Sequence, residues 1–196
     1  MDEMKLPDNV PESEAATKKT RSEIYDWLRC IVTAILVCVL IFIFAARIVG
    51  VVGSSMLPTL HEGDRIITSN LFYKPKHGDI VVFRKESFDE RSLVKRVIAT
   101  EFQTVRIDFE QGIVYVDGEA LEEDYVNAPT LRPLDFKGEI TVPEGCVFVM
   151  GDNRNESTDS RSEFLGCVDT RYIIGRGYIV FLPLRDFKFL GRPDYE

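Results

Sequence analysis

Two adjacent serines, Ser54 and Ser55, follow Gly53 in the segment GSSMLPTL, residues 53–60. A serine hydroxyl can act as a nucleophile, but at neutral pH it needs a neighbouring base that removes its proton. Glycine, serine and proline are also the usual residues of an ordinary loop. The segment is therefore a candidate catalytic site only if the chain also supplies a base.

Histidine is the usual base for such a serine, and the chain has two, His61 and His77. Each histidine precedes a turn that contains Gly-Asp, so we expect both to be solvated loop residues. If neither serves, the remaining route is the Ser–Lys variant of the catalytic triad, in which a neutral lysine is the base.

Lys95 is the best lysine for that role. In an extended strand, Lys95 shares one face with Leu93, Val97 and Ala99. Arg96 shares the other face with Val94 and Ile98. Both faces of this segment are therefore apolar. Arginine keeps its proton in proteins, whereas burial disfavours the charged form of lysine. To act near neutral pH, the pKa of Lys95 must fall by about 2–3 from about 10.4. A strand lysine whose amine reaches solvent is the alternative interpretation.

A dense polar segment, GDNRNESTDSR at residues 151–161, follows a hydrophobic strand-like run. A surface turn would account for such a composition in most proteins. In a functional interpretation, Ser157 donates a hydrogen bond that orients the lysine amine, and Asp159 pairs with Arg161 to hold the loop.

These segments, in this order, resemble the successive motifs of bacterial type I signal peptidases. The matching residues are Ser55-Met56-x-Pro58-Thr59-Leu60, Gly78-Asp79-Ile80-Val81, Lys95-Arg96-Val97, and Gly151-Asp152-Asn153-Arg154 with Ser157-x-Asp159-Ser160-Arg161. Any one motif is weak, but four in order behind an N-terminal anchor are specific.

The resemblance implies a serine endopeptidase and roles for five residues: Ser55 as nucleophile, Lys95 as general base, Ser157 as the hydroxyl that positions the lysine, and Asp159 with Arg161 as a structural ion pair. It also implies a coiled β-sheet catalytic domain. The implied substrates are secretory precursors with small residues at positions −1 and −3 before the cut.

The chain departs from the family pattern at two places. Some relatives have a serine two positions before the nucleophile, whose hydroxyl is a second oxyanion donor, and this chain has Gly53 there. The family usually follows its lysine strand with a Gly-Leu-Pro-Gly-Asp-like turn, whereas this chain has Ala99-Thr100-Glu101-Phe102-Gln103-Thr104. We therefore expect a differently built hairpin beyond Lys95.

An apolar run without charged residues covers residues 30–46. As a helix it would span roughly 25 Å, and it extends to residue 50 if Arg47 reaches the interface. Basic residues precede the run, which puts the N-terminus in the cytoplasm by the positive-inside tendency. We predict a cytoplasmic tail (1–28), a transmembrane signal anchor in the cell membrane (29–50) and an extracytoplasmic catalytic domain (51–196). A cleaved signal peptide and a buried core helix are the alternatives.

The segment after residue 50 shows short β-like runs separated by turn signals, and no helical period. The predicted strands cover residues 65–68, 79–83, 93–99, 113–116, 147–150, 172–174 and 178–181. Asp117-Gly118 is a hairpin dipeptide. The sequence therefore predicts a mainly β domain with one core, preceded by one transmembrane helix.

The composition excludes some classes of protein. A net charge of −8 over 196 residues does not suggest a nucleic-acid partner. The chain has no CxxC and no paired histidines, so we expect no metal or other cofactor. Cys30 and Cys38 lie in the apolar run, and we expect Cys146 and Cys167 to be buried free thiols, with a disulfide between them as the alternative.

Three other functions fit parts of the pattern. A membrane-tethered β module could bind extracytoplasmic peptides without cleaving them, but the Ser55 and Lys95 pair argues against it. A self-cleaving Ser–Lys regulator would carry a DNA-binding domain, and the sequence shows no helix-turn-helix pattern. A specialised peptidase for dedicated substrates agrees with the sequence as well as a general one does.

Overall fold

The computed structural model describes residues 12–85, 88 and 91–193, and the side chains of residues 23–40 and 46–193 within that range. The chain divides into two units, Met1–Phe44 and Ala45–Glu196. Within the described residues the first unit is helical and the second is mainly β, so each is described by itself.

The helical unit consists of α1 (Glu12–Ala45). Among the side chains described for this helix, no stretch combines the length and the apolar character needed to cross a membrane. The apolar run expected at residues 30–46 lies partly outside the described side chains, at residues 41–45. The helix ends at Ala45, and residues 47–50, expected to continue it, form strand β1 (Arg47–Gly50) instead. These residues pair with a second strand, β2, which satisfies their backbone hydrogen bonds.

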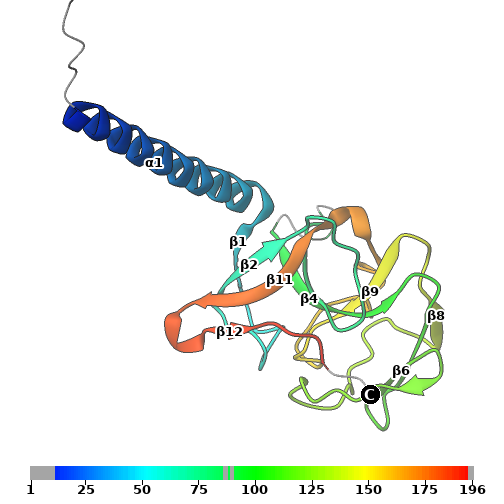
Figure 1. The fold of residues 1–196 in the computed structure, drawn as a ribbon. Helices are drawn as coiled ribbons and strands as arrows, with labels where there is room; N and C mark the ends of the chain where they lie inside the picture. Colours follow the sequence, from blue (N-terminus) through cyan, green and yellow to red (C-terminus); the bar gives the residue numbers. More distant parts are fainter. Residues whose placement is uncertain (1–11, 86–87, 89–90, 194–196) are drawn as a thin grey trace, which may run out of the picture. The chain divides into compact units, whose positions relative to one another are not determined.

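The larger of two antiparallel sheets has the strand order β1-β2-β11-β3-β4-β9-β10, and β12 pairs with β11 (Figure 1). Its further strands are β2 (Arg65–Ser69), β3 (Ile80–Phe83), β4 (Leu93–Thr100), β9 (Cys146–Met150), β10 (Val168–Asp169), β11 (Ile173–Leu182) and β12 (Lys188–Phe189). Two 3₁₀ turns, Thr170–Tyr172 and Leu184–Asp186, flank β11. The sheet brings β4, which carries Lys95, between β3 and β9.

The smaller sheet has the order β7-β6-β5-β8. Its strands are β5 (Thr104–Asp108), β6 (Ile113–Val116), β7 (Glu119–Ala120) and β8 (Glu139–Thr141). The predicted Asp-Gly hairpin joins β6 to β7, and both Asp117 and Gly118 have positive φ, as a type I′ turn requires. In Figure 1 β6 and β8 lie at the opposite side of this unit from β1 and β2.

Five of the seven predicted strands are observed to within one residue at each end, and the prediction of a mainly β domain is confirmed. The last two predicted strands form one continuous strand, β11. Gly175 lies so close to the neighbouring strand that an added Cβ would stand 2.9 Å from the Ser69 backbone. The glycine therefore permits close strand packing here, where the sequence suggested a turn.

The core surrounds β4 on both faces, since six of its eight residues are buried. Val94 packs in one apolar cluster with Met56 and Leu60, Val97 belongs to a second cluster, and Ile98 to a third. A lysine in the middle of such a strand has little access to water, and this burial favours the neutral form of the Lys95 amine.

Candidate active site

The loop that carries Ser55 is held by its apolar neighbours. Gly53 begins the loop with a φ of +84°, a conformation that favours glycine. The Leu60 amide donates to the Met56 carbonyl at 2.8 Å, and both side chains are buried in the core. Ser55 lies between these anchors and the surface, half-buried, so that its hydroxyl faces the protein while its loop remains accessible.

The amine of Lys95 lies 2.6 Å from the hydroxyl oxygen of Ser55. The residue is only 3% exposed, and burial lowers the pKa of its amine to about 8. The carboxylates of Asp159 and Asp152 act against burial and raise this pKa, whereas Arg161 lowers it. The structure thus brings together the two predicted residues, with a lysine that can lose its proton near neutral pH.

Ser157 is fully buried beside Gly151, because an added Cβ at Gly151 would collide with the Ser157 side chain and stand 2.5 Å from the Ser55 carbonyl oxygen. Among the described residues its hydroxyl has no hydrogen-bond partner, so the bond expected from Ser157 to the lysine amine is not formed. Ser157 is therefore close to the Ser55 backbone without holding the amine of Lys95.

Asp159 and Arg161 form a buried ion pair, with the Arg161 Nε and Nη2 atoms each 2.8 Å from a carboxylate oxygen. Asp159 also accepts from the Gly151 amide at 3.0 Å. Arg161 donates to the carbonyls of Arg132 and Arg154. The pair fixes both ends of the polar loop that begins at Gly151.

Asp152 and Asn153, between this pair and Ser55, connect the loop to the serine. The Asn153 amide donates to the Ser55 carbonyl at 3.0 Å, and its side chain donates to the Ser54 carbonyl at 3.1 Å. Asp152 accepts two hydrogen bonds from Arg96, the residue after Lys95. Sequence reasoning matched these residues to a motif but assigned them no role, because their partners lie far away along the chain.

The loop between β7 and β8 also reaches the site, and sequence reasoning missed it. Arg154 is buried and ion-paired with Glu123 of this loop, and its Nη1 donates to Thr130 at 2.9 Å. The Tyr125 ring lies over the Arg96 guanidinium at 3.9 Å. These contacts join residues of different segments, so no spacing within the loop predicts them.

The two histidines differ from each other. His61 is exposed in its turn, as predicted. His77 is half-buried and donates from Nδ1 to the Ile98 carbonyl, so the prediction that it is solvated is wrong. The turn that it precedes is packed against β4, because the Gly78 amide donates to Val97 and the Val97 amide donates to Asp79. Burial lowers the pKa of His77, which has a structural contact that accounts for its position.

The four cysteines are free, which confirms free thiols at Cys146 and Cys167, although both are half-buried and not fully buried. Burial raises the pKa of the Cys167 thiol to about 11. Among the described residues there is no group of three or more histidine, cysteine or acidic side chains that could hold a metal ion.

Known proteins similar to this chain share one family. The family described as "Signal peptidase, peptidase S26" matches residues 24–182. The chain is 37% identical to Probable signal peptidase I-1 of Synechocystis sp., over 82% of this chain and 84% of the relative. It is 36% identical to Signal peptidase I T of Bacillus subtilis, over 92% of this chain and 96% of the relative. It is 33% identical to Signal peptidase I of Bacillus amyloliquefaciens, over 91% and 95%.

Proposed function

We propose, since this chain belongs to the signal peptidase family, peptidase S26, and is therefore a serine endopeptidase, that it removes signal peptides from secretory precursors with Ser55 as nucleophile and Lys95 as general base. The observation that carries the choice of residues is the 2.6 Å contact between the Lys95 amine and the Ser55 hydroxyl. Burial of the amine supports the role of base, because it favours the neutral form.

The reaction begins with the neutral form of Lys95. Its amine accepts the proton of the Ser55 hydroxyl while the hydroxyl oxygen attacks the carbonyl carbon of the scissile bond. The protonated amine then gives this proton to the departing amine of the mature protein, which leaves an acyl-enzyme on Ser55. Lys95, neutral again, takes a proton from a water molecule that attacks the ester, and it gives this proton to the Ser55 oxygen as the signal peptide is released.

The negative oxygen that forms in each attack needs a hydrogen-bond donor. The Ser55 amide is the proposed donor, because the described residues offer it no hydrogen-bond acceptor. Asn153 supports this role, since its two bonds hold the carbonyls on either side of that amide. Gly53 has no hydroxyl to offer a second donor.

Ser157, Asp159 and Arg161 support the pair from the polar loop. The buried ion pair holds the Gly151 amide, and Ser157 packs against Gly151 beside the Ser55 carbonyl. In this proposal Ser157 acts on the serine loop through its packing against Gly151.

The proposed location is the cell membrane, with a single-pass anchor that begins at residue 29 and ends before β1, the N-terminus in the cytoplasm and the catalytic unit outside. The support is the uncharged run of residues 30–46 and the basic residues before it, Lys18, Lys19, Arg21 and Arg29. Membrane lipid and secretory precursors are then the partners of the chain.

The decisive experiment is cleavage of a precursor with small residues at −1 and −3 by the purified full chain, compared with the variants Ser55→Ala, Lys95→Ala and Lys95→Arg. We expect the wild type to cut once after the small residue, and all three variants to lose activity by roughly 10³-fold or more. Full activity of Lys95→Arg would overturn the proposed base, because a guanidinium keeps its proton. Cleavage by Ser55→Ala would overturn the nucleophile.

A further inference from the structure

We propose that Tyr125 is a positioning residue for this reaction, because its ring covers the Arg96 guanidinium that, with Thr59, holds Asp152 next to the Ser55–Lys95 pair. The inference rests on the proposed function. It concerns a residue outside every motif by which the sequence resembles the signal peptidases.

The first step is the contact between Arg96 and Asp152. Arg96 follows Lys95 on β4, and its side chain leaves the strand on the opposite face. Its Nε and Nη2 atoms lie 2.8 and 2.6 Å from the two oxygens of Asp152, and its Nη1 donates to the Gly78 carbonyl at 2.9 Å. Both residues are buried, so this two-pronged pair orients Asp152 firmly.

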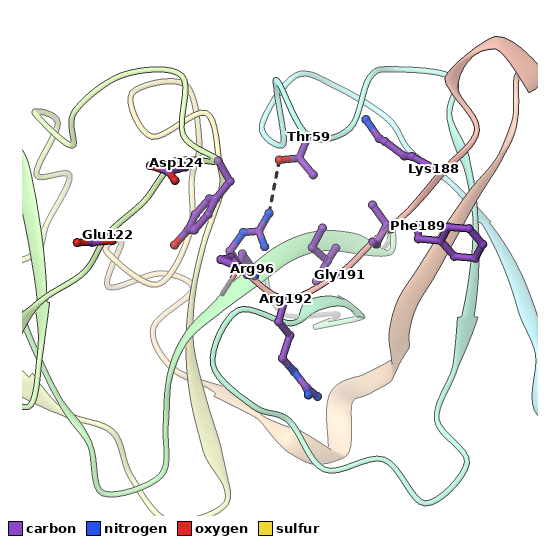
Figure 2. A pocket seen from close by; sticks show the side chains of 12 residues that line it. Thr59, Arg96, Glu122, Asp124, Lys188, Phe189, Gly191 and Arg192 are labelled. Carbon is purple, nitrogen blue, oxygen red and sulfur yellow. Dashed lines mark hydrogen bonds between the residues drawn. The ribbon is translucent and has the colours of Figure 1, made fainter. Parts of the chain in front are cut away.

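The second step is Thr59, on the loop of Ser55. Its hydroxyl donates to an Asp152 oxygen at 2.5 Å and accepts from Arg96 at 3.4 Å, the bond drawn in Figure 2. Asp152 therefore joins three segments: the Ser55 loop, the Lys95 strand and the loop whose Asn153 binds the Ser55 carbonyl. A shift of Asp152 would therefore move both the Ser55 loop and the strand that carries Lys95.

The third step is the position of Tyr125. Its ring centroid lies 3.9 Å from the Arg96 guanidinium carbon and 5.8 Å from that of Arg154, and its hydroxyl donates to Glu123 at 2.8 Å. Attraction between a guanidinium and an aromatic face is strongest where both are desolvated. The hydroxyl of Tyr125 is thus held by Glu123, and its ring lies over a guanidinium that is held by Asp152.

The surroundings explain why a cover is needed there. Thr59, Arg96 and Tyr125 line a cavity of about 530 Å³. In Figure 2 the acidic side chains Glu122 and Asp124 lie on one side of Arg96, and Lys188 lies on the other. Without the ring, one face of the guanidinium would be open to this polar cavity, and water would compete for its bonds to Asp152.

The consequence for Lys95 follows from the charges that face it: Asp159, Asp152 and Arg161. Arg161 neutralises Asp159, and Arg96 neutralises Asp152. If Arg96 loosens, the carboxylate of Asp152 acts on the lysine without compensation and favours its protonated form. Entry of water would also favour the protonated form of Lys95, because it reduces the burial that keeps the amine neutral.

The experiment compares the wild-type full chain with Tyr125→Leu, Tyr125→Phe and the control Tyr115→Leu. Tyr115 also stacks on an arginine, Arg106, at 3.9 Å, but in the smaller sheet. We expect Tyr125→Leu to lower kcat roughly three- to tenfold at pH 7 with KM unchanged, and to move the acidic limb of the pH–rate profile to higher pH. Tyr125→Phe keeps the ring and should restore the wild-type profile.

An unchanged pH–rate profile in Tyr125→Leu would overturn the inference, as would an equal shift in Tyr115→Leu. If Tyr125→Leu does not fold, Tyr125→Met gives the same comparison with a flexible apolar side chain. A wild-type chain that does not cleave the precursor, or one whose cleavage survives Ser55→Ala, overturns the proposed function and this inference with it. Ser55-dependent cleavage with an indifferent Tyr125 overturns the inference alone.

Discussion

The Lys95 amine and the Ser55 hydroxyl oxygen, 40 residues apart in the chain, lie 2.6 Å from each other. The lysine is held by a strand that is buried on both faces, and the serine by a loop anchored in the same core. Because both anchors are apolar packing, the amine pays a desolvation cost that it would avoid at a surface. That cost lowers the pKa of the amine, so that part of Lys95 is neutral near pH 7.

The first prediction concerns pH. With the pKa of Lys95 at about 8, roughly a tenth of the enzyme has a neutral base at pH 7. We expect log kcat/KM for precursor cleavage to rise by about one per pH unit below pH 8 and to level off above it. His77→Asn is the control, and a limb that shifts in this variant would identify the histidine, not Lys95, as the titrating group.

The second prediction concerns stability. The pKa of Lys95 is lower in the folded chain than the value of about 10.4 in the unfolded chain, so unfolding takes up protons between about pH 8 and 10. The free energy of unfolding should therefore rise with pH across this window. Below pH 8 the full cost of the buried ammonium applies, about 3 kcal/mol at most.

Lys95→Met removes that cost, so we expect this variant to be more stable than the wild type at pH 7, by about 1–3 kcal/mol in urea unfolding. The gain should vanish near pH 10. Lys188→Met, in the short strand β12, is the control, with an expected change within about 0.5 kcal/mol. A Lys95→Met chain that is less stable than the wild type at pH 7 would contradict the burial argument.

Most of the catalytic unit could be predicted from local sequence. Strand runs such as residues 93–99 and the Asp117-Gly118 hairpin are encoded by neighbouring residues, and both were observed. The end of α1 was not predictable from hydrophobicity, because Ile48 and Val49 suit a helix in lipid and a strand in a sheet equally well. Their pairing with β2 decides the outcome, and that partner lies some 20 residues further along the chain.

The site shows the same division. Motif spacing suggested Ser55, Lys95 and the Asp159–Arg161 pair. In the structure Lys95 contacts Ser55, Arg161 pairs with Asp159, and Asp159 binds the Gly151 amide of the polar loop. Tyr125 carries no such signal, because its importance comes only from the residue that its ring covers. The burial of His77 and the packing of Ser157 on Gly151 likewise depend on contacts between distant segments.

The third prediction concerns Gly151. A Cβ at this position would collide with the Ser157 side chain and with the Ser55 carbonyl, so Gly151→Ala must displace the serine loop. Since a misplacement of about 1 Å can reduce a catalytic rate by about 10²-fold, we expect a loss of kcat of that order. Gly50→Ala is the control, because no atom lies within 4 Å of its added Cβ. A wild-type kcat in Gly151→Ala would contradict this prediction, because it would mean that displacement of the serine loop does not slow the reaction.

The last prediction separates a buried ion pair from an exposed one. Arg161→Met leaves the buried Asp159 without the arginine of its ion pair, and removal of one member of a buried pair destabilises a protein by about 3–5 kcal/mol. Arg171 forms a pair of similar geometry with Asp169, but its side chain is 85% exposed, so Arg171→Met should cost less than about 1 kcal/mol. Urea unfolding of the two variants measures the difference. Equal losses in the two variants would contradict the argument that burial makes the Asp159–Arg161 pair the more stabilising one.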